Sequence, residues 1–270
     1  MLRDPFTVRA DQLLVKRGLA PSRTAARRMI EAGRVRAGDA PVGKASEELD
    51  EQAPLAVSES PDDRFVSRGG LKLAGALAEV GLDVRGLVCL DVGQSTGGFS
   101  DCLLQAGAER VVGVDVGHGQ LHPRLRGDAR VRVLEGVNAR HLVASQLIAA
   151  GAGGTGAEGR FGSNFDLIVG DLSFISLTLV LPALAPLLKP GGHLLLLVKP
   201  QFELQPADIG KGGIVRDAAL YAKVEQRLRA ACAEAGLAVR HWLPSPIAGG
   251  DGNREFFIHA AAAAISVTQT

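Results

Sequence analysis

Short aliphatic runs alternate with stretches of helical pattern from Leu71 onward, and this alternation constrains the fold more than any other feature of the chain. Helices between consecutive strands are typical of βαβ units, in which helices cover both faces of a parallel sheet. Five strands of this kind are predicted at Leu87–Leu90, Val111–Val114, Val131–Leu134, Phe165–Val169 and His193–Val198. We therefore expect an α/β domain.

The last two strand candidates depart from this alternation. Ala238–Leu243 and Glu255–Ala260 lie close together in the sequence, with no helical pattern between them. Two such strands can pair directly, because antiparallel neighbours need no crossover helix. We expect an antiparallel pair at the edge of the otherwise parallel sheet.

A glycine-rich segment, DVGQSTGG at Asp91–Gly98, directly follows the first of these strands. Glycines between a strand and a helix let the backbone approach a ligand closely and expose amides at the helix N-terminus. The spacing is not G-x-G-x-x-G, so the dinucleotide fingerprint is absent. An acid followed by glycines at this spacing suits a loop that folds around the methionine part of S-adenosylmethionine (SAM).

A second acid supports this interpretation. Asp115 ends the second strand, where a carboxylate can accept hydrogen bonds from both hydroxyls of a ribose. Asn138, just past the third strand, is a candidate for the adenine side. The predicted cofactor-binding residues are Asp91, Gly93, Ser95, Thr96, Gly97, Asp115 and Asn138.

The same letters allow a different enzyme. Gly93–Gly97 also matches G-x-S-x-G, the nucleophile elbow of α/β hydrolases, and Asp171 with His241 or His259 follows in the appropriate order. That elbow follows a central strand with several strands before it, whereas here only a small basic module precedes. We therefore favour the SAM loop over the hydrolase, and over a glycine turn without a ligand.

The first 60 or so residues form that basic module. Met1–Lys44 holds ten Lys and Arg against four Asp and Glu, a net of +6, although the whole chain has a net charge of only +1. We expect a helix over Val8–Arg17, a second from a Ser22 cap to Ala32, and then a small hairpin. Its candidate phosphate-binding residues are Arg9, Lys16, Arg23, Arg27, Arg28, Arg34 and Arg36.

Residues 61–66 read as a linker, which gives domains at 1–60 and 67–270. The three cysteines are odd in number and form no C-x-x-C pair, so we expect neither a disulfide framework nor a metal site. They suit a reducing cytoplasm. The longest wholly aliphatic run, Leu194–Val198, is too short to span a bilayer, so we expect no membrane partner.

Seven motifs occur together in one order along the chain. They are VSRGGLKL (66–73), DVGQSTGGF (91–99), GVDVGHGQL (113–121), DLSFISL (171–177), VKPQFE (198–203), GKGGIVRD (210–217) and SPIAGGDGNREFF (245–257). The set resembles the TlyA (haemolysin A) family. The N-terminal stretch RADQLLVKRGLAPSRTAARRMIEAGRV is similar to the S4 RNA-binding domain of that family.

This resemblance implies a ribosomal-RNA ribose 2′-O-methyltransferase. It implies a Rossmann-like class I SAM-dependent fold with a mostly parallel seven-stranded sheet, preceded by a small α+β S4 domain. Departures from the family pattern include Gln94, where Ala is usual, and His118, where Tyr is usual. Gln94 is the residue of the loop for which the sequence offers no explanation.

The resemblance also implies a catalytic tetrad. Carried over motif by motif, it consists of Lys72, Asp171, Lys199 and Glu255, with Lys199 as general base and the two carboxylates orienting the amines. Asp171 and Lys199 directly follow predicted strands, where an open α/β sheet places its ligands. Lys211 and Arg216, in a glycine-rich loop, are further candidates for RNA phosphate.

Two other functions remain open at this level. One is an RNA-binding ribosome-assembly protein with a vestigial methyltransferase domain, and the other is a haemolysin. The resemblance implies ribosomal RNA or ribosomal subunits as partners and a cytidine in 16S or 23S rRNA as the target. The sequence does not determine the oligomeric state.

Overall fold

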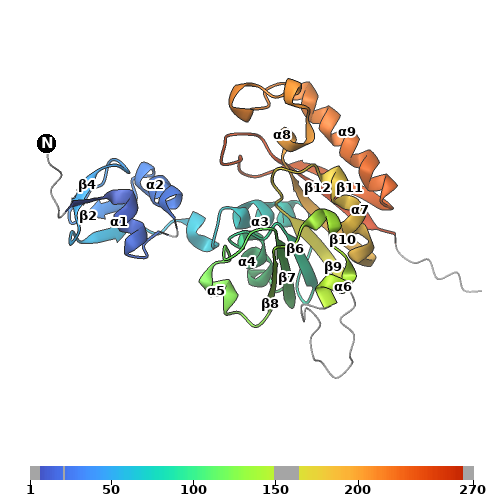
Figure 1. Ribbon diagram of the computed structural model, residues 1–270, viewed down its shortest axis with the longest axis horizontal. Coiled ribbons are helices and arrows are strands. Elements are labelled where there is room, and N and C mark those ends of the chain that lie inside the picture. Colours follow the sequence, from blue (N-terminus) through green and yellow to red (C-terminus); the bar gives the residue numbers. More distant parts are fainter. Residues whose placement is uncertain (1–6, 21, 149–163, 264–270) are drawn as a thin grey trace, which may run out of the picture. The chain divides into compact units, whose positions relative to one another are not determined.

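The computed structural model describes residues 7–20, 22–148 and 164–263, and the chain divides into two compact units between Arg64 and Phe65 (Figure 1). The expected linker of residues 61–66 straddles this division. Pro61–Arg64 form the 3₁₀ helix η1, whereas Phe65 is buried in the core of the second unit.

The first unit is a small α+β module. Two short sheets, β1–β4 and β3–β2–β5, accompany two helices, and all of their strand pairs are antiparallel. Its elements are β1 (Thr7–Arg9), α1 (Ala10–Lys16), α2 (Arg23–Glu31), β2 (Val35–Ala37), β3 (Ala40–Pro41), β4 (Glu48–Asp50) and β5 (Leu55–Val57). Leu13, Leu14, Ala26, Ile30 and Val35 form its buried core.

The expected helix over Val8–Arg17 is wrong at its start. Val8 lies in β1 and pairs with Leu49 of β4, so the helix begins only at Ala10. A partner 41 residues away overrides the local helical pattern. The second helix is confirmed, and the Ser22 hydroxyl accepts a hydrogen bond from the Ala25 amide as its N-cap.

The second unit contains a seven-stranded sheet in the order β11–β12–β10–β9–β6–β7–β8. Its strands are β6 (Val88–Val92), β7 (Arg110–Asp115), β8 (Val131–Glu135), β9 (Phe165–Gly170), β10 (Leu188–Val198), β11 (Leu237–Pro244) and β12 (Phe256–Ala262). The five strands from β6 to β10 pair in parallel, and β12 pairs antiparallel with both β10 and β11. The predicted mostly parallel sheet with an antiparallel edge is confirmed.

Two strand boundaries differ from the expectation. β10 begins at Leu188 rather than His193, because Leu188 already pairs with Phe165 before an irregularity in the ladder. Glu255, expected to open the last strand, lies immediately before β12. Its side chain therefore comes from the end of the preceding loop.

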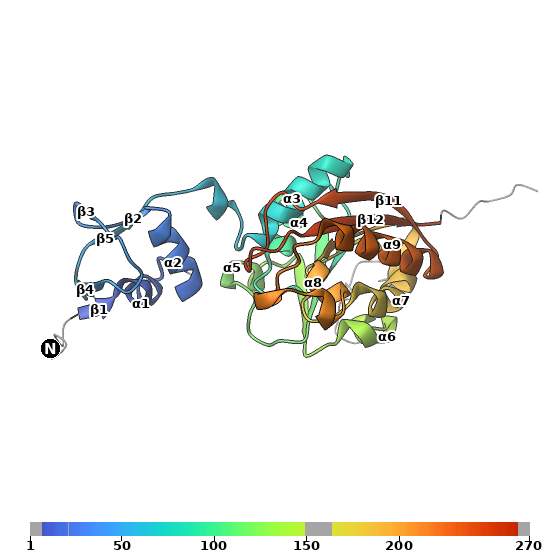
Figure 2. The same cartoon turned by 90° about the horizontal axis from the view of Figure 1, so that it is seen from above.

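Helices cover both faces of the sheet. They are α3 (Gly69–Val80), α4 (Gly98–Gln105), α5 (Pro123–Arg126), α6 (Ala144–Leu147), α7 (Leu181–Leu184), α8 (Pro200–Glu203) and α9 (Ala218–Glu234), with 3₁₀ turns η2 (Ala139–His141), η4 (Leu177–Leu179), η5 (Ala185–Leu187), η6 (Pro206–Asp208) and η7 (Lys211–Gly213). Figure 2 shows α3 and α4 on one side of the sheet and α6, α7 and α9 on the other. Alternating strand residues fill the two cores: Leu90 packs toward α7 and α9, and Cys89 toward α3 and α4.

The strand order reverses between β6 and β9, which are hydrogen-bonded neighbours although β7 and β8 separate them in the chain. In open α/β sheets the crevice at such a switch point binds ligands, at the carboxyl ends of the strands. This point lies between the glycine-rich loop and Asp171. Among the described residues, no helix is long and apolar enough to cross a membrane.

Candidate functional site

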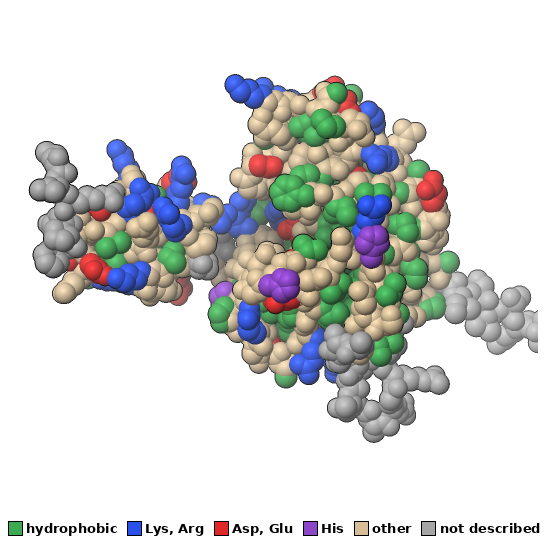
Figure 3. Space-filling view, viewed as in Figure 1, with side chains coloured by type: hydrophobic (Ala, Val, Ile, Leu, Met, Phe, Trp, Pro, Cys, Tyr) green, Lys and Arg blue, Asp and Glu red, His purple; other side chains and the backbone are tan. Residues whose placement is uncertain are grey.

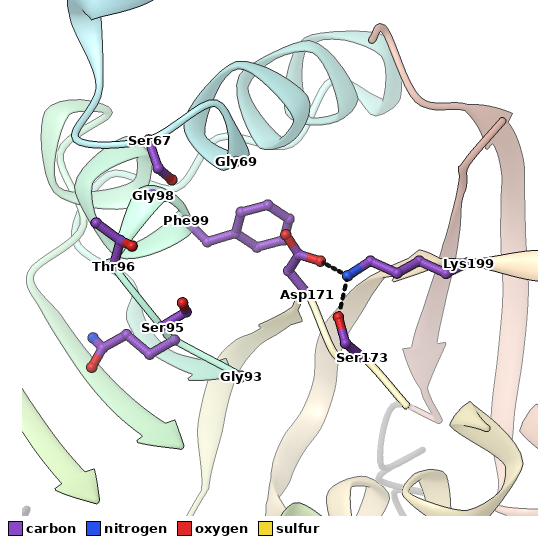
Figure 4. Close-up of a pocket in the computed structure, with 11 residues that line it drawn as sticks. Ser67, Gly69, Gly93, Ser95, Thr96, Gly98, Phe99, Asp171, Ser173 and Lys199 are labelled. Atoms are coloured by element: carbon purple, nitrogen blue, oxygen red, sulfur yellow. Dashed lines mark hydrogen bonds and ion pairs between the residues drawn. The ribbon is translucent and has the colours of Figure 1, made fainter. Parts of the chain in front are cut away.

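An open cleft of about 190 Å³ lies at the carboxyl ends of β6, β9 and β10 (Figure 4). Its walls come from the start of α3, the glycine-rich loop and the ends of β9 and β10. The lining residues are Ser67, Gly69, Gly93, Gln94, Ser95, Thr96, Gly98, Phe99, Asp171, Ser173 and Lys199.

The glycine-rich loop turns sharply between β6 and α4. Gly93, Ser95 and Gly97 all have positive φ, at 80°, 48° and 94°. A side chain at Gly97 would overlap Leu125 of α5, so this position requires glycine for space as well as for conformation. The turn presents the backbone and hydroxyl groups of Ser95 and Thr96 to the cleft.

Asp115 is fixed at the tip of β7 by two backbone amides. Ser95 N donates to Oδ2 at 2.8 Å and Gly117 N donates to Oδ1 at 2.7 Å. Each carboxylate oxygen keeps a lone pair for another donor. Val116 follows with 64% of its surface exposed and offers an apolar surface beside this acid. Sequence reasoning missed Val116, because an exposed valine has no motif of its own.

Asp91 lies beneath the loop rather than in its wall and is fully buried. The Ser100 hydroxyl donates to Asp91 Oδ2 at 2.7 Å, and Gln94 Nε2 donates to Ser100 Oγ at 2.7 Å. Burial raises the pKa of Asp91 to about 7, and the hydrogen bond from Ser100 opposes this rise. The carboxamide of Gln94 fills the space that a side chain at Gly113 would occupy. Gln94 therefore closes a buried polar chain under the loop.

Lys199 and Asp171 meet at the ends of neighbouring strands. Lys199 Nζ forms an ion pair with Asp171 Oδ1 at 2.6 Å and donates a hydrogen bond to Ser173 Oγ at 2.8 Å (Figure 4). The side chain of Lys199 is only 12% exposed. Its amine is therefore held at the floor of the cleft beside the loop.

Lys72 and Glu255 form a second ion pair, with Nζ and Oε2 2.5 Å apart. Lys72 projects from α3, and both side chains are buried. Burial raises the pKa of Glu255, while the hydrogen bond from Lys72 lowers it, and Asp171 and Lys199 also act on it electrostatically. The two pairs are thus close enough to interact, and the structure brings all four tetrad candidates together.

Two residues that sequence reasoning left without a role frame this cluster. Glu203 of α8 is buried and accepts hydrogen bonds from Ser176 Oγ at 2.6 Å and Leu177 N at 2.7 Å. It ties the segment after Lys199 to the loop after Asp171. Phe174 is 90% exposed, has a φ of +63°, and contacts the Phe202 ring at a centroid distance of 5.0 Å.

Strain and exposure together suggest a function for Phe174. An L-residue other than Gly, Asn or Asp seldom adopts a positive φ, and such positions cluster at functional sites. An exposed aromatic ring forgoes the burial that normally favours it. Phe174 follows Ser173, which lines the cleft, although Phe174 is not itself among the lining residues. No spacing in the sequence signals it.

Other candidates occupy different positions. Asn138 caps η2, since its Oδ1 accepts a hydrogen bond from Arg140 N. Lys211 and Arg216 are exposed in the loop around η7, which Asn253 holds through Val215 N and Gly213 O. Arg254, next to Glu255, stacks over the rings of Tyr221 and Phe256 at 5.5 and 5.7 Å.

The arrangement does not support a hydrolase triad. Asp171 pairs with Lys199 rather than with a histidine. Both ring nitrogens of His259 contact other histidines, His193 at 3.0 Å and His241 at 2.9 Å. The backbone amide of Ser95 donates a hydrogen bond to Asp115, which holds Ser95 in the loop. The nucleophile-elbow interpretation lacks its base.

Most of the basic candidates in the first unit are bound by another group of the protein. Arg34 donates to Ser58 O and pairs with Asp63, and its side chain is only 16% exposed. Arg36 donates to Asp39 O, and Lys16 pairs with Glu51. Arg27 pairs with Glu31 on the outer face of α2, and Arg28 is exposed. Arg9 and Arg23 both bind Asp11.

Comparisons with known proteins agree with this geometry. The model of the FtsJ-like methyltransferase family matches residues 65–262, and that of the S4 domain matches residues 8–53. TlyA of Mycobacterium tuberculosis, named as a 16S/23S rRNA (cytidine-2′-O)-methyltransferase, is 41% identical over 93% of this chain and 88% of its own. This chain belongs to the TlyA family. The resemblance inferred from the motifs is confirmed.

Two further TlyA-family relatives match over similar lengths. YqxC of Bacillus subtilis, provisionally named an rRNA methyltransferase, is 45% identical over 93% of this chain and 84% of its own. A solved structure from Streptococcus thermophilus, provisionally named a hemolysin, is 39% identical and covers 95% of this chain and 89% of its own, with a TM-score of 0.72. Both relatives thus match this TlyA-family chain over most of their own length.

Proposed function

We propose that this protein transfers a methyl group from SAM to the 2′-hydroxyl of a ribose in ribosomal RNA. The observation that carries the proposal is the meeting of Lys199 and Asp171 beside the glycine-rich loop, with the Lys72–Glu255 pair next to them. A ribose hydroxyl is a very weak acid, so its methylation needs a positioned base as well as an activated methyl group.

The cleft fits SAM in its donor set. Asp115 does not line the cleft itself but is hydrogen-bonded to the lining residue Ser95, and it offers two anchored carboxylate oxygens for ribose hydroxyls. The turn at Gly93 and Gly97 brings backbone groups to the cleft wall. When bound, SAM supplies a methyl group already activated by the sulfonium charge. Asp91 acts from below, because its carboxylate supports the loop through Ser100.

Lys199 is the proposed general base. A lysine accepts a proton only as the neutral amine. As such, its Nζ would take the proton of the 2′-hydroxyl while the new oxygen–carbon bond forms and the sulfur–methyl bond of SAM breaks, which would leave S-adenosylhomocysteine. Asp171 and Ser173 orient that amine at 2.6 and 2.8 Å. The buried Lys72–Glu255 pair lies within electrostatic range of Lys199, and Glu255 is the tetrad member we expect to help hold the target nucleotide.

Phe174 is the proposed platform for the target base. A nucleotide whose ribose reaches Lys199 must leave its stack, and the exposed ring next to the lining residue Ser173 could replace the lost stacking. Lys211, Arg216 and Arg254 would contact the neighbouring phosphates. These contacts supply affinity rather than sequence specificity.

Ribosomal RNA, free or within ribosomal subunits, is the proposed substrate. The names of two relatives specify a cytidine, in 16S and 23S rRNA for the Mycobacterium tuberculosis protein and in 23S rRNA for that of Campylobacter jejuni. We propose a cytidine here as well, with the cytoplasm as the place of action. A vestigial domain would not be expected to retain the buried Lys72–Glu255 pair, because removal of either partner would leave a costly isolated buried charge.

The test uses purified full-length protein, SAM carrying a labelled methyl group, and 30S and 50S subunits that lack the modification. Label should enter one subunit or both, at a ribose whose 3′ phosphodiester then resists alkaline cleavage. Calorimetry with SAM separates the vestigial alternative, which predicts no binding. Label in a base or in protein, or none with either subunit, would contradict the proposal.

A further inference from the structure

The first unit contains a carboxylate that is buried although it lies among arginines. Asp11, on α1, is only 4% exposed. Arg9, at the end of β1, donates from Nε to Asp11 Oδ1 at 3.0 Å and from Nη2 to Oδ2 at 3.1 Å. Arg23, the first residue of α2, donates from Nε and Nη2 to Asp11 Oδ2 at 3.2 and 2.9 Å. One acid thus joins two arginines that are 14 residues apart.

Arg9 and Arg23 each bind Asp11 through the Nε and Nη2 atoms of the guanidinium group. A guanidinium carries five N–H donors, and the Nε–Nη2 edge engages two of them. The Nη1 edge of Arg9 and of Arg23 is therefore turned away from the carboxylate. The two side chains keep 30% and 57% of their surface exposed, whereas that of Asp11 keeps 6%. The acid faces the protein and the remaining donors face outward.

The charge of this group is fixed. Hydrogen bonds from Arg9, and then from Arg23, hold the pKa of Asp11 at about 2, so the carboxylate is ionised at any physiological pH. Two guanidinium ions and one carboxylate leave a net charge of +1. The surroundings are also basic, because the module carries a net of +6 over its first 44 residues. Lys and Arg side chains project from the described surface of this unit in Figure 3.

We propose that Arg9, Asp11 and Arg23 form a preorganised clamp for an RNA phosphodiester, in which Asp11 is the positioning residue. The inference rests on the proposed RNA substrate and adds a defined phosphate site to it. Arginine side chains lose rotamer freedom on binding, and a residue that holds them in place beforehand lowers that cost. The two non-bridging oxygens of a phosphate match the planar donor edge of a guanidinium.

The clamp differs from the other basic residues of the unit. Arg34 and Arg36 are bound to backbone carbonyls, and Arg27 pairs with an exposed carboxylate, Glu31. An exposed pair of this kind contributes little order, since water competes for both partners. Among the described acids that pair with the candidate arginines, Asp11 alone is buried and holds two of them.

Replacement of Asp11 separates a positioning role from a simple charge effect, because the two explanations predict opposite changes in RNA affinity. Asp11→Asn removes a negative charge, so simple electrostatic attraction predicts tighter RNA binding with a steeper salt dependence. The clamp predicts binding roughly 5- to 10-fold weaker, with a log–log salt slope smaller by about 1. Glu31→Gln, which removes the same charge from an exposed pair on α2, should bind RNA as well as the wild type or slightly more tightly.

Full-length protein is titrated, without SAM, into fluorescent in vitro transcripts of bacterial 16S and 23S rRNA at several salt concentrations. Arg23→Lys keeps the charge but loses the planar fork, so it should also weaken binding even if Asp11→Asn proves unstable. In an Arg9→Ala/Arg23→Ala background, Asp11→Asn should have no further effect on affinity. Equal or tighter binding by both Asp11→Asn and Arg23→Lys would overturn the clamp alone. Failure of the wild-type protein to bind either transcript would overturn the RNA substrate itself.

Discussion

The carboxylate of Glu203 accepts a 2.6 Å hydrogen bond from the hydroxyl of Ser176. This bond joins α8, which follows Lys199, to the loop that follows Asp171. A second bond, from Leu177 N to the other oxygen of Glu203, strengthens the same connection. The relative position of Lys199 and Asp171 therefore depends on a residue outside the cleft.

Replacement of Glu203 should lower turnover more than cofactor binding. Glu203→Ala leaves the buried Leu177 amide without an acceptor, a cost of about 1–3 kcal/mol, and also removes the acceptor of the Ser176 hydroxyl, which loosens the Lys199 loop. Because a displacement near 1 Å can reduce a rate by about 100-fold, we expect kcat to fall at least 10-fold while SAM affinity changes less than about twofold. Glu203→Gln keeps an acceptor and should retain most activity. Equal losses for both variants in methyl-transfer assays would contradict this role.

The carboxamide of Gln94 lies where a side chain at Gly113 of β7 would have to be. Gly113→Ala should lower the free energy of unfolding by about 1–3 kcal/mol, because the new methyl group overlaps the Gln94 carboxamide. Gln94→Ala should relieve much of that overlap, so the double variant should be more stable than additivity predicts. Gly127→Ala is the control, since its nearest neighbour would be 3.9 Å away. Additive urea-unfolding energies would show that the two residues do not compete.

His259 should make the fold sensitive to acid. Burial, aided by the charges of His193, His241 and Arg240, lowers the pKa of His259 to about 4. Its unfolded pKa is near 6.5, so between about pH 6.5 and 4 the unfolded chain binds more protons and stability falls as pH falls. Replacement by Gln removes this contribution.

The measurement is urea unfolding of the wild type and His259→Gln at several pH values from 4.5 to 7.5. Below pH 6.5 the wild type should lose up to about 1 kcal/mol per pH unit more than the variant, after allowance for solvent screening. His141→Gln, at an exposed histidine, should behave as the wild type. Parallel curves for wild type and His259→Gln would refute the prediction.

Phe174 should matter for RNA and not for the fold. Because its side chain is 90% exposed, Phe174→Ala should change the free energy of unfolding by less than about 1 kcal/mol. Stacking of a base on an aromatic ring contributes about 1–3 kcal/mol, so methyl transfer at low RNA concentration should fall roughly 5- to 100-fold. Phe174→Tyr keeps the ring and should restore transfer. Full activity of Phe174→Ala would contradict the proposed stacking role of this residue.

Much of the catalytic unit could be predicted because its signals are local. Seven aliphatic runs mark seven strands, and a residue that ends such a run, such as Asp115, or follows it, such as Asp171, lies at the carboxyl edge of the sheet. That edge is where open α/β sheets bind ligands. The position of the glycine-rich loop between strand and helix is equally local.

Long-range contacts account for what the sequence could not show. Val8 reads as helical until Leu49 pairs with it. Gln94 fits in the loop only because Gly113, on β7, has no side chain. Arg34 reads as a free cation, yet its guanidinium is bound to Ser58 O and Asp63. In each case the decisive neighbour is at least 19 residues away in the sequence.

Lys199 carries the central claim, and β9 and β10 supply a matched control for it. Lys189 pairs with Asp166 at 2.7 Å near the opposite ends of the same two strands. A Lys-to-Ala replacement at either position removes one charge and one Lys–Asp pair. Only the pair at Lys199 adjoins the cleft.

The most direct measurement is single-turnover methyl transfer from labelled SAM to unmodified ribosomal subunits by wild type, Lys199→Ala and Lys189→Ala, with SAM binding followed by calorimetry. We predict that Lys199→Ala binds SAM normally but transfers methyl at least about 100-fold more slowly, as loss of a general base requires. Lys189→Ala should transfer at close to the wild-type rate. Transfer by Lys199→Ala at the rate of Lys189→Ala would contradict the assignment of Lys199 as the base.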